Sequence, residues 1–145
     1  MTPPTGMVPV GGLFLGGRMT LLYIALGGAA GAVARYGLGG WIQGRAGFGF
    51  PVGTLMVNVL GSLLAGCSLR YLEAVRLGPE MRALVAVGLL GAFTTFSTFS
   101  YETVMLLEEG AWGRAAGYAL GSLALGITAV YVGFAISAYL LHVRT

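Results

Sequence analysis

Hydrophobic and polar positions in this chain separate into long blocks. Asp, Glu, Lys and Arg are absent from residues 19–34, 46–69, 83–101 and 115–141. A bilayer core of about 30 Å is crossed by roughly 20 helical residues, so each block is long enough to contribute a spanning helix. The pattern therefore predicts an all-α transmembrane protein with helices over about residues 19–42, 50–72, 80–108 and 113–142.

The first 18 residues, MTPPTGMVPVGGLFLGGR, differ from the rest of the chain because they are rich in Pro and Gly. They lack the basic start and compact apolar core of a secretory signal. We expect a disordered N-terminal extension, to which no function is assigned, and a single four-helix membrane domain over residues 19–145.

Composition supports a membrane class, since 57% of the residues are hydrophobic and 9% are charged, against about a quarter charged in soluble domains. All eight basic residues are arginines, and the net charge of +3 gives no reason to expect a nucleic-acid partner. With four spans, one side carries more arginines, which favours that side as cytoplasmic. That side has Arg18, Arg70, Arg76, Arg82 and Arg144, while the other has Arg45 and Arg114, and Arg35 is ambiguous.

Residues capable of catalysis are scarce. Cys67 and His142 are each the only residue of their type, which excludes a disulfide within the chain and a multi-cysteine metal site. No Ser/His/Asp arrangement shares one depth, and no glycine loop is followed by the Lys and Ser/Thr of a phosphate-binding motif. We therefore do not expect an enzyme.

The segment TTFSTFS, residues 94–100, is unusual because it places five hydroxyl side chains and two phenylalanines in an apolar stretch. Such a density of hydroxyls after Gly91 predicts a break in the third helix, near residues 91–96. A break leaves main-chain carbonyls that can hold a cation. Phe96 and Phe99, three residues apart, can project to one side, and their positive ring edges can contact an anion.

A second polar position lies in the middle of an uncharged span. Asn58 must face a partner or a pore, because an unpaired amide in the membrane costs a few kcal/mol. Its NH₂ group is a hydrogen-bond donor, as are the hydroxyls of Thr95, Thr98, Ser122 and Thr128. A path lined by such donors suits a small, strongly hydrated anion.

Glycines recur every four residues on two helices and predict close helix contacts. Gly27 and Gly31 share one face of the first span, and Gly113, Gly117 and Gly121 share one face of the fourth. Four short helices have much surface to cover, which favours a homo-oligomer. Contacts within one chain would produce the same pattern, so that alternative stays open.

Three motifs resemble the Fluc (CrcB) family of fluoride channels: GGAAGAVARY at 27–36, GTLMVNVLGSLLAG at 53–66 and GLLGAFTTFSTFSYE at 88–102. They occur in order and with the family's spacing, and the resemblance covers residues 19–142. It implies a dual-topology dimer of two antiparallel four-helix subunits with two fluoride pores. The implied function is passive export of cytoplasmic fluoride, and hence fluoride resistance, in the inner or plasma membrane of a prokaryote.

The same resemblance implies roles for individual residues. Phe96 and Phe99 match the pore-lining aromatic pair and Asn58 the pore asparagine. The carbonyls of Gly91 and Thr94 are implied to bind a structural sodium ion at the dimer centre. Further matches are a polar pore track of Tyr118, Ser122 and Thr128, nearby motif hydroxyls of Ser97 and Thr98, and a vestibular or structural pair, Arg35 and Glu102.

Two features depart from the family's pattern. Ala92 stands where many members have a second glycine, and the arginine bias is large for a chain that inserts in both orientations. The bias leaves open a heterodimer with an oppositely oriented relative.

Two other functions remain as alternatives. A small four-helix exporter needs a carboxylate within the membrane, and the only acidic residue near the interior of a span is Glu102, at the edge of the third. A noncatalytic membrane assembly subunit would leave TTFSTFS and Asn58 unexplained.

Overall fold

The computed structural model describes residues 18–47 and 49–143, and all regular structure in these residues is helical. The expected extension, apart from Arg18, and Arg144 of the arginine-rich side lie outside the described residues. Four helical spans are long and apolar enough to cross a membrane, which confirms the predicted all-α class. The elements are α1 (Arg18–Ala46), α2 (Val52–Ala74), α3 (Pro79–Arg82), η2 (Ala83–Leu90), α4 (Gly91–Phe93), α5 (Phe96–Glu108) and α6 (Trp112–His142).

Local sequence explains where several elements begin and end. Gly47, with φ of 84°, follows α1, and Gly110, with φ of 72°, follows α5. Both lie in the left-handed region that glycine adopts without steric cost and that commonly ends a helix. Pro79 opens α3 at a position where its missing N–H is not needed.

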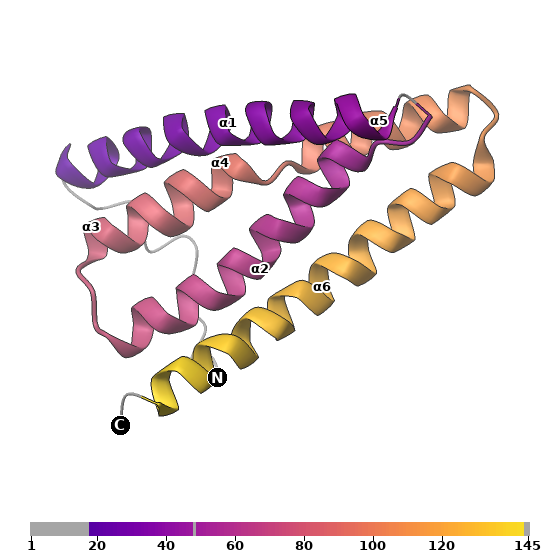
Figure 1. The fold of residues 1–145 in the computed structure, drawn as a ribbon. Helices are drawn as coiled ribbons and strands as arrows, with labels where there is room; N and C mark the ends of the chain where they lie inside the picture. The colour runs from indigo at the N-terminus through magenta and orange to yellow at the C-terminus, as the bar shows by residue number, and fades with distance from the viewer. Residues whose placement is uncertain (1–17, 48, 144–145) are drawn as a thin grey trace, which may run out of the picture.

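The third span is composite, because α3, η2, α4 and α5 follow one another between Pro79 and Glu108. Its middle part, η2, is a π-helix. Figure 1 shows α1 lying along this span, while α2 and α6 run side by side. Residue contacts agree, since α1 packs mainly against η2 and α2 packs mainly against α6.

Glycines permit the close approach of α1 to the third span. A Cβ atom added to Gly27 would collide with the carbonyl oxygen of Leu84, and one added to Gly31 with that of Leu89. Both glycines are buried. The prediction that this face of α1 packs closely is confirmed.

The glycine face of α6 behaves differently. A Cβ atom at Gly113, Gly117 or Gly121 would meet nothing within 4 Å in the described part of the chain. The predicted close contact at this face is therefore not made within the described residues.

Enlarging Gly31 should separate α1 from the third span. Gly31→Ala places a methyl group against backbone, which cannot rotate away, so we expect destabilisation of about 1–3 kcal/mol. Gly28→Ala is the matched control on the same helix, because nothing lies within 4 Å of its added Cβ. Thermal unfolding of the detergent-purified protein measures both, and equal midpoints for the two variants would contradict this account.

Candidate functional site

The third span contains two extended residues between α4 and α5. Thr94 has φ of −82° and ψ of 156°, and Thr95 has φ of −147° and ψ of 113°. The Thr95 hydroxyl accepts a hydrogen bond from the N–H of Thr98 at 3.2 Å, so Thr95 is the N-cap of α5. A hydroxyl residue at this position satisfies one of the N–H groups that a helix start leaves unpaired.

Asn58 of α2 binds the backbone of this extended segment at two points. The Thr95 N–H donates to the Asn58 side-chain oxygen at 2.7 Å, and the Asn58 NH₂ donates to the Thr95 carbonyl at 3.0 Å. Thr95 is buried, with 7% of its surface exposed. The amide thus supplies hydrogen-bond partners to backbone that has left regular helical geometry. Asn58 was expected to face a partner or a pore, and its partner is the backbone of Thr95.

The hydrogen bonds at Thr95 also change the surroundings of two carbonyls. A continuous helix would direct the N–H of Thr95 at the Gly91 carbonyl and the N–H of Thr98 at the Thr94 carbonyl. Instead, these two N–H groups donate to Asn58 and to the Thr95 hydroxyl. Gly91 and Thr94 therefore carry carbonyls that have lost their regular helical donors.

Aromatic rings continue from the start of α5 to the neighbouring helices. The ring centroids of Phe96 and Phe99 are 5.7 Å apart, and those of Phe99 and Tyr118 are 5.2 Å apart. Phe50 meets Tyr118 edge-on at 5.5 Å. Tyr118 is fully buried, whereas 80% of Phe96 is exposed, so the row runs from the interior to the protein surface.

Glu102 receives two hydroxyl hydrogen bonds from different helices. Thr54 of α2 donates to one carboxylate oxygen at 2.8 Å, and Tyr118 of α6 donates to the other at 2.6 Å. Because Glu102 belongs to α5, these two hydrogen bonds join α2, α5 and α6.

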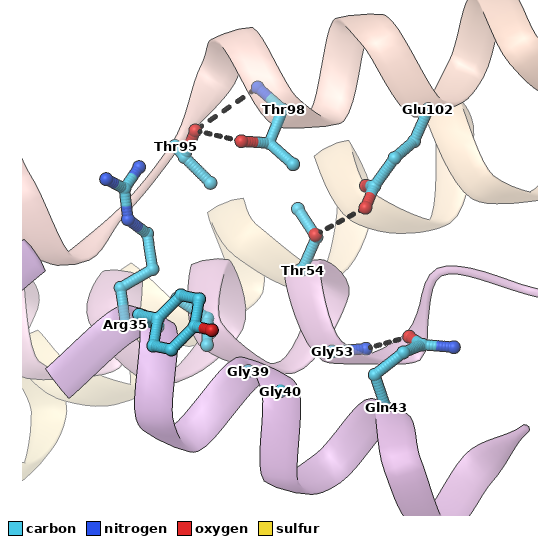
Figure 2. A pocket seen from close by; sticks show the side chains of 11 residues that line it. Arg35, Gly39, Gly40, Gln43, Gly53, Thr54, Thr95, Thr98 and Glu102 are labelled. Atoms are coloured by element: carbon cyan, nitrogen blue, oxygen red, sulfur yellow. Dashed lines mark hydrogen bonds between the residues drawn. The ribbon is translucent and has the colours of Figure 1, made fainter. Parts of the chain in front are cut away.

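A cavity of about 380 Å³ lies between α1, α2 and α5, and Thr54 and Glu102 are among its lining residues. Figure 2 shows Arg35 and Gln43, both from α1, at opposite ends of the pocket, with Thr54 and Glu102 between α2 and α5. Thr95 and Thr98 also line it. The cavity offers one guanidinium, one carboxylate and several hydroxyls, and no group of three His, Cys, Asp or Glu side chains in the described residues could hold a metal ion.

The remaining predicted polar residues lie along α6. Ser122, one turn after Tyr118, has a buried hydroxyl oxygen without a hydrogen-bond partner in the described residues. Thr128 is exposed.

The predicted hydroxyls of Ser97 and Thr98 lie in the first turn of α5, beside Thr95. The Ser97 hydroxyl oxygen is 3.3 Å from that of Thr95, and the Thr95 hydroxyl donates to the Thr98 hydroxyl at 2.9 Å.

Sequence reasoning missed two residues of this site. Thr54 lies one helical turn before Asn58, and that spacing places both on one face of α2. Gln43 accepts from the Gly53 N–H at 2.9 Å and donates to the Phe50 carbonyl at 3.0 Å, which fixes the start of α2. No sequence signal identified Gln43, because its partners lie beyond the turn between α1 and α2 and their position depends on the conformation of that turn.

Comparison with known proteins gives consistent results. The sequence model of the family described as CrcB-like protein, Camphor Resistance (CrcB), matches residues 22–134. A protein of Thermus thermophilus named fluoride-specific ion channel FluC is 53% identical over 113 residues, which cover 78% of this chain and 89% of the relative. Proteins of the same name from Shewanella amazonensis (52% identical; 78% of this chain, 91% of the relative) and Acidobacterium capsulatum (48%; 81% and 95%) are also similar. The chain therefore belongs to the CrcB family.

Proposed function

We propose that this protein is a passive, fluoride-selective anion channel, and therefore not an enzyme. The observation that carries the proposal is the extended segment at Thr94 and Thr95, after which the Thr98 hydroxyl and the Phe96–Phe99 pair lie inside an apolar span. The names of the similar proteins support the same ion. In this proposal the extended segment is the functional break of the third span.

Fluoride suits such a surface better than chloride does. It is the smaller ion and the stronger hydrogen-bond acceptor, so each hydroxyl contact lowers its free energy more. Thr98 lines the cavity beside the segment, and the buried Ser122 hydroxyl has no partner in the described residues. The ring edges of Phe96 and Phe99 add weak positive potential without a fixed charge that would trap the ion.

The channel is proposed to work as a dimer of antiparallel subunits with two pores. Two surfaces support a second chain: the exposed ring of Phe96 and the glycine face of α6, where added Cβ atoms would meet nothing within 4 Å in the described residues. Antiparallel copies place the same face of each subunit in one symmetric contact. A homodimer is the simplest assembly, and the arginine bias keeps a heterodimer as its alternative.

In the cell, the proposed direction of net flow is outward across a prokaryotic inner or plasma membrane. Hydrogen fluoride enters uncharged and ionises in the more neutral cytoplasm, where the anion would otherwise accumulate. A passive pore suffices for export, since the membrane potential repels anions from the interior.

The proposal is tested by anion efflux from liposomes that contain the purified protein. We expect fluoride to leave at least about 100-fold faster than chloride, because each of several donor contacts, worth about 1 kcal/mol, favours the stronger acceptor. Efflux should need no proton gradient, which separates a channel from an exporter. Equal fluoride and chloride efflux would refute the selectivity. Efflux of neither ion would refute the channel and favour the alternative of a noncatalytic membrane assembly subunit.

Asn58 is proposed to act by holding the break rather than only by contacting fluoride. Replacing Asn58 with Leu keeps the branching of the side chain and leaves the Thr95 N–H unpaired, at about 1–3 kcal/mol, while the Thr95 carbonyl loses the amide donor but, as the N-cap carbonyl, still accepts the first bond of α5. We expect a lower unfolding midpoint together with a fluoride flux reduced at least about tenfold.

Ser62→Ala, one turn later on α2, is the control for Asn58→Leu and should change neither quantity. Flux and thermal unfolding are measured on the same preparations. Loss of flux with an unchanged unfolding midpoint would show that the amide serves the ion and not the backbone.

A structural sodium ion is proposed at the dimer centre, held by the carbonyls of Gly91 and Thr94 from each subunit. The fit rests on main-chain geometry, because the N–H groups of Thr95 and Thr98 are directed elsewhere. Carbonyl oxygens are the ligands that hard cations prefer. A bound cation would supply a fixed positive charge beside the proposed pores, which favours anions.

Removal of sodium tests this site, because side-chain substitutions leave main-chain ligands in place. Protein purified in N-methylglucamine buffer is expected to lose dimer stability and fluoride flux, and added sodium should restore both. Potassium at the same concentration controls for ionic strength. Full dimer stability and flux in carefully sodium-free protein would overturn the sodium proposal while leaving the fluoride proposal intact.

A further inference from the structure

Gln43, near the end of α1, belongs neither to the proposed pore nor to the proposed sodium site, yet its side chain lines two cavities. One is the cavity of about 380 Å³ between α1, α2 and α5, and the other, of about 200 Å³, lies beside the turn between α1 and α2. Among the described residues, Gln43 and Glu102 are common to both linings. The two cavities therefore adjoin at these two side chains.

Gln43 supplies the helix cap that α2 lacks in its own sequence. The N-cap residue of α2 is Pro51, whose ring has no hydrogen-bond acceptor, and its side chain makes no capping bond. Instead, the Gly53 N–H donates to the side-chain oxygen of Gln43 at 2.9 Å. The Gln43 NH₂ group donates to the carbonyls of Gly47 and, at 3.0 Å, Phe50. One amide from α1 thus fixes both the turn and the first turn of α2.

The backbone that Gln43 holds leads directly to one of the two groups that bind Glu102. Thr54 follows Gly53 in the chain, and its hydroxyl donates to one carboxylate oxygen at 2.8 Å. Figure 2 shows the two interactions beside each other, with the Gly53 N–H bonded to Gln43 and the Thr54 hydroxyl bonded to Glu102. A displacement of the first turn of α2 would therefore move this hydroxyl relative to the carboxylate.

The second donor to Glu102 is connected to the same turn. Tyr118 donates to the other carboxylate oxygen at 2.6 Å, and its ring meets that of Phe50 edge-on at 5.5 Å. The carbonyl of Phe50 is one of the groups that Gln43 binds. Gln43 therefore holds backbone beside both hydroxyl donors, although its own hydrogen bonds go to backbone alone.

The position of the Glu102 carboxylate matters for an anion. Thr98, whose hydroxyl is a proposed fluoride donor, lines the same cavity of about 380 Å³ as Glu102. Like charges repel each other, and they do so more strongly in the low dielectric of a protein than in water. A Glu102 side chain without its bond to Thr54 is free to turn into this cavity, where its charge opposes the entry of fluoride.

We propose that Gln43 is a positioning residue for anion conduction. By capping α2 from α1, it keeps Glu102 bound at the border of the two cavities and out of the path of fluoride. This inference rests on the proposed fluoride channel, and it adds a residue that acts through backbone rather than by binding the ion.

Gln43→Met tests the proposal, because methionine is unbranched, of similar length and without an amide. We expect the unitary fluoride current, recorded from single channels in planar bilayers, to fall at least about threefold, since a like charge then faces the ion. The unitary current belongs to one folded channel, so a variant that only folds less well gives fewer channels of normal current.

Gly44→Ala, the neighbouring position on α1, is the matched control. A Cβ atom added to Gly44 would meet nothing within 4 Å in the described part of the chain, and Gly44 is not among the described residues that line either cavity. Its unitary current should equal that of the wild type. Gln43→Asn, with an amide one methylene shorter, is the second variant if Gln43→Met does not fold, and it should lower the unitary current in the same way.

Glu102→Gln tests whether Gln43 acts through the carboxylate. The substitution removes the charge and keeps an oxygen that accepts hydrogen bonds. In this background, the Gln43 variants should lower the unitary current by less than about 1.5-fold, because both changes act through one group and their effects are not additive.

Three results would overturn the proposal. The first is a wild-type unitary current in the Gln43 variants, and the second is an equal loss of current with and without Glu102→Gln. The third is a Glu102→Gln channel without any current, which would show that conduction requires the charge itself. A wild-type protein that passes no fluoride would instead refute the proposed function, so the two failures are distinguishable.

Discussion

A polypeptide inside the hydrocarbon core of a membrane must satisfy its own backbone, because the acyl chains offer no hydrogen bonds. At Thr94 and Thr95 the third span leaves helical geometry, and the side chain of Asn58 compensates by pairing with both polar groups of Thr95. This pairing fixes α2 against the extended segment. Gly61, one turn after Asn58, lacks the side chain that would collide with the Thr94 methyl group, so the same helix face can approach.

The chemistry of the site follows from that arrangement. With Thr95 held by Asn58, its hydroxyl caps α5, and the first turn of α5 places Phe96 beside Phe99. Glu102, further along α5, then reaches the hydroxyls of Thr54 and Tyr118. One backbone constraint thus organises side chains from three helices, and the resulting surface offers hydroxyl donors and ring edges near a single engaged carboxylate.

Glycine serves two different surfaces in this fold. On α1, Gly27 and Gly31 let the helix contact the carbonyls of the third span. On α6, a Cβ atom added to Gly113, Gly117 or Gly121 would meet nothing within 4 Å in the described residues. Much of the apolar surface is likewise exposed, with 86% of Tyr36 and 70% of Tyr131 accessible. Such a protomer is completed by its surroundings, which are lipid and, in the function proposed here, a second subunit.

The sequence by itself determined the class of this protein, because long uncharged blocks have only one stable form in a bilayer, the spanning helix. It also identified TTFSTFS and Asn58 as exceptional, since polar groups are costly at that depth wherever they point. Only the tertiary structure decided their partners. Asn58 and Thr95 are 37 residues apart, and Thr54 and Glu102 are 48 apart, so each pairing depends on how whole helices are placed. Periodicity places residues on one face of a helix, but which face meets another helix, as at Gly31, and which stays open, as at Gly117, depends on the shape of the neighbouring surfaces.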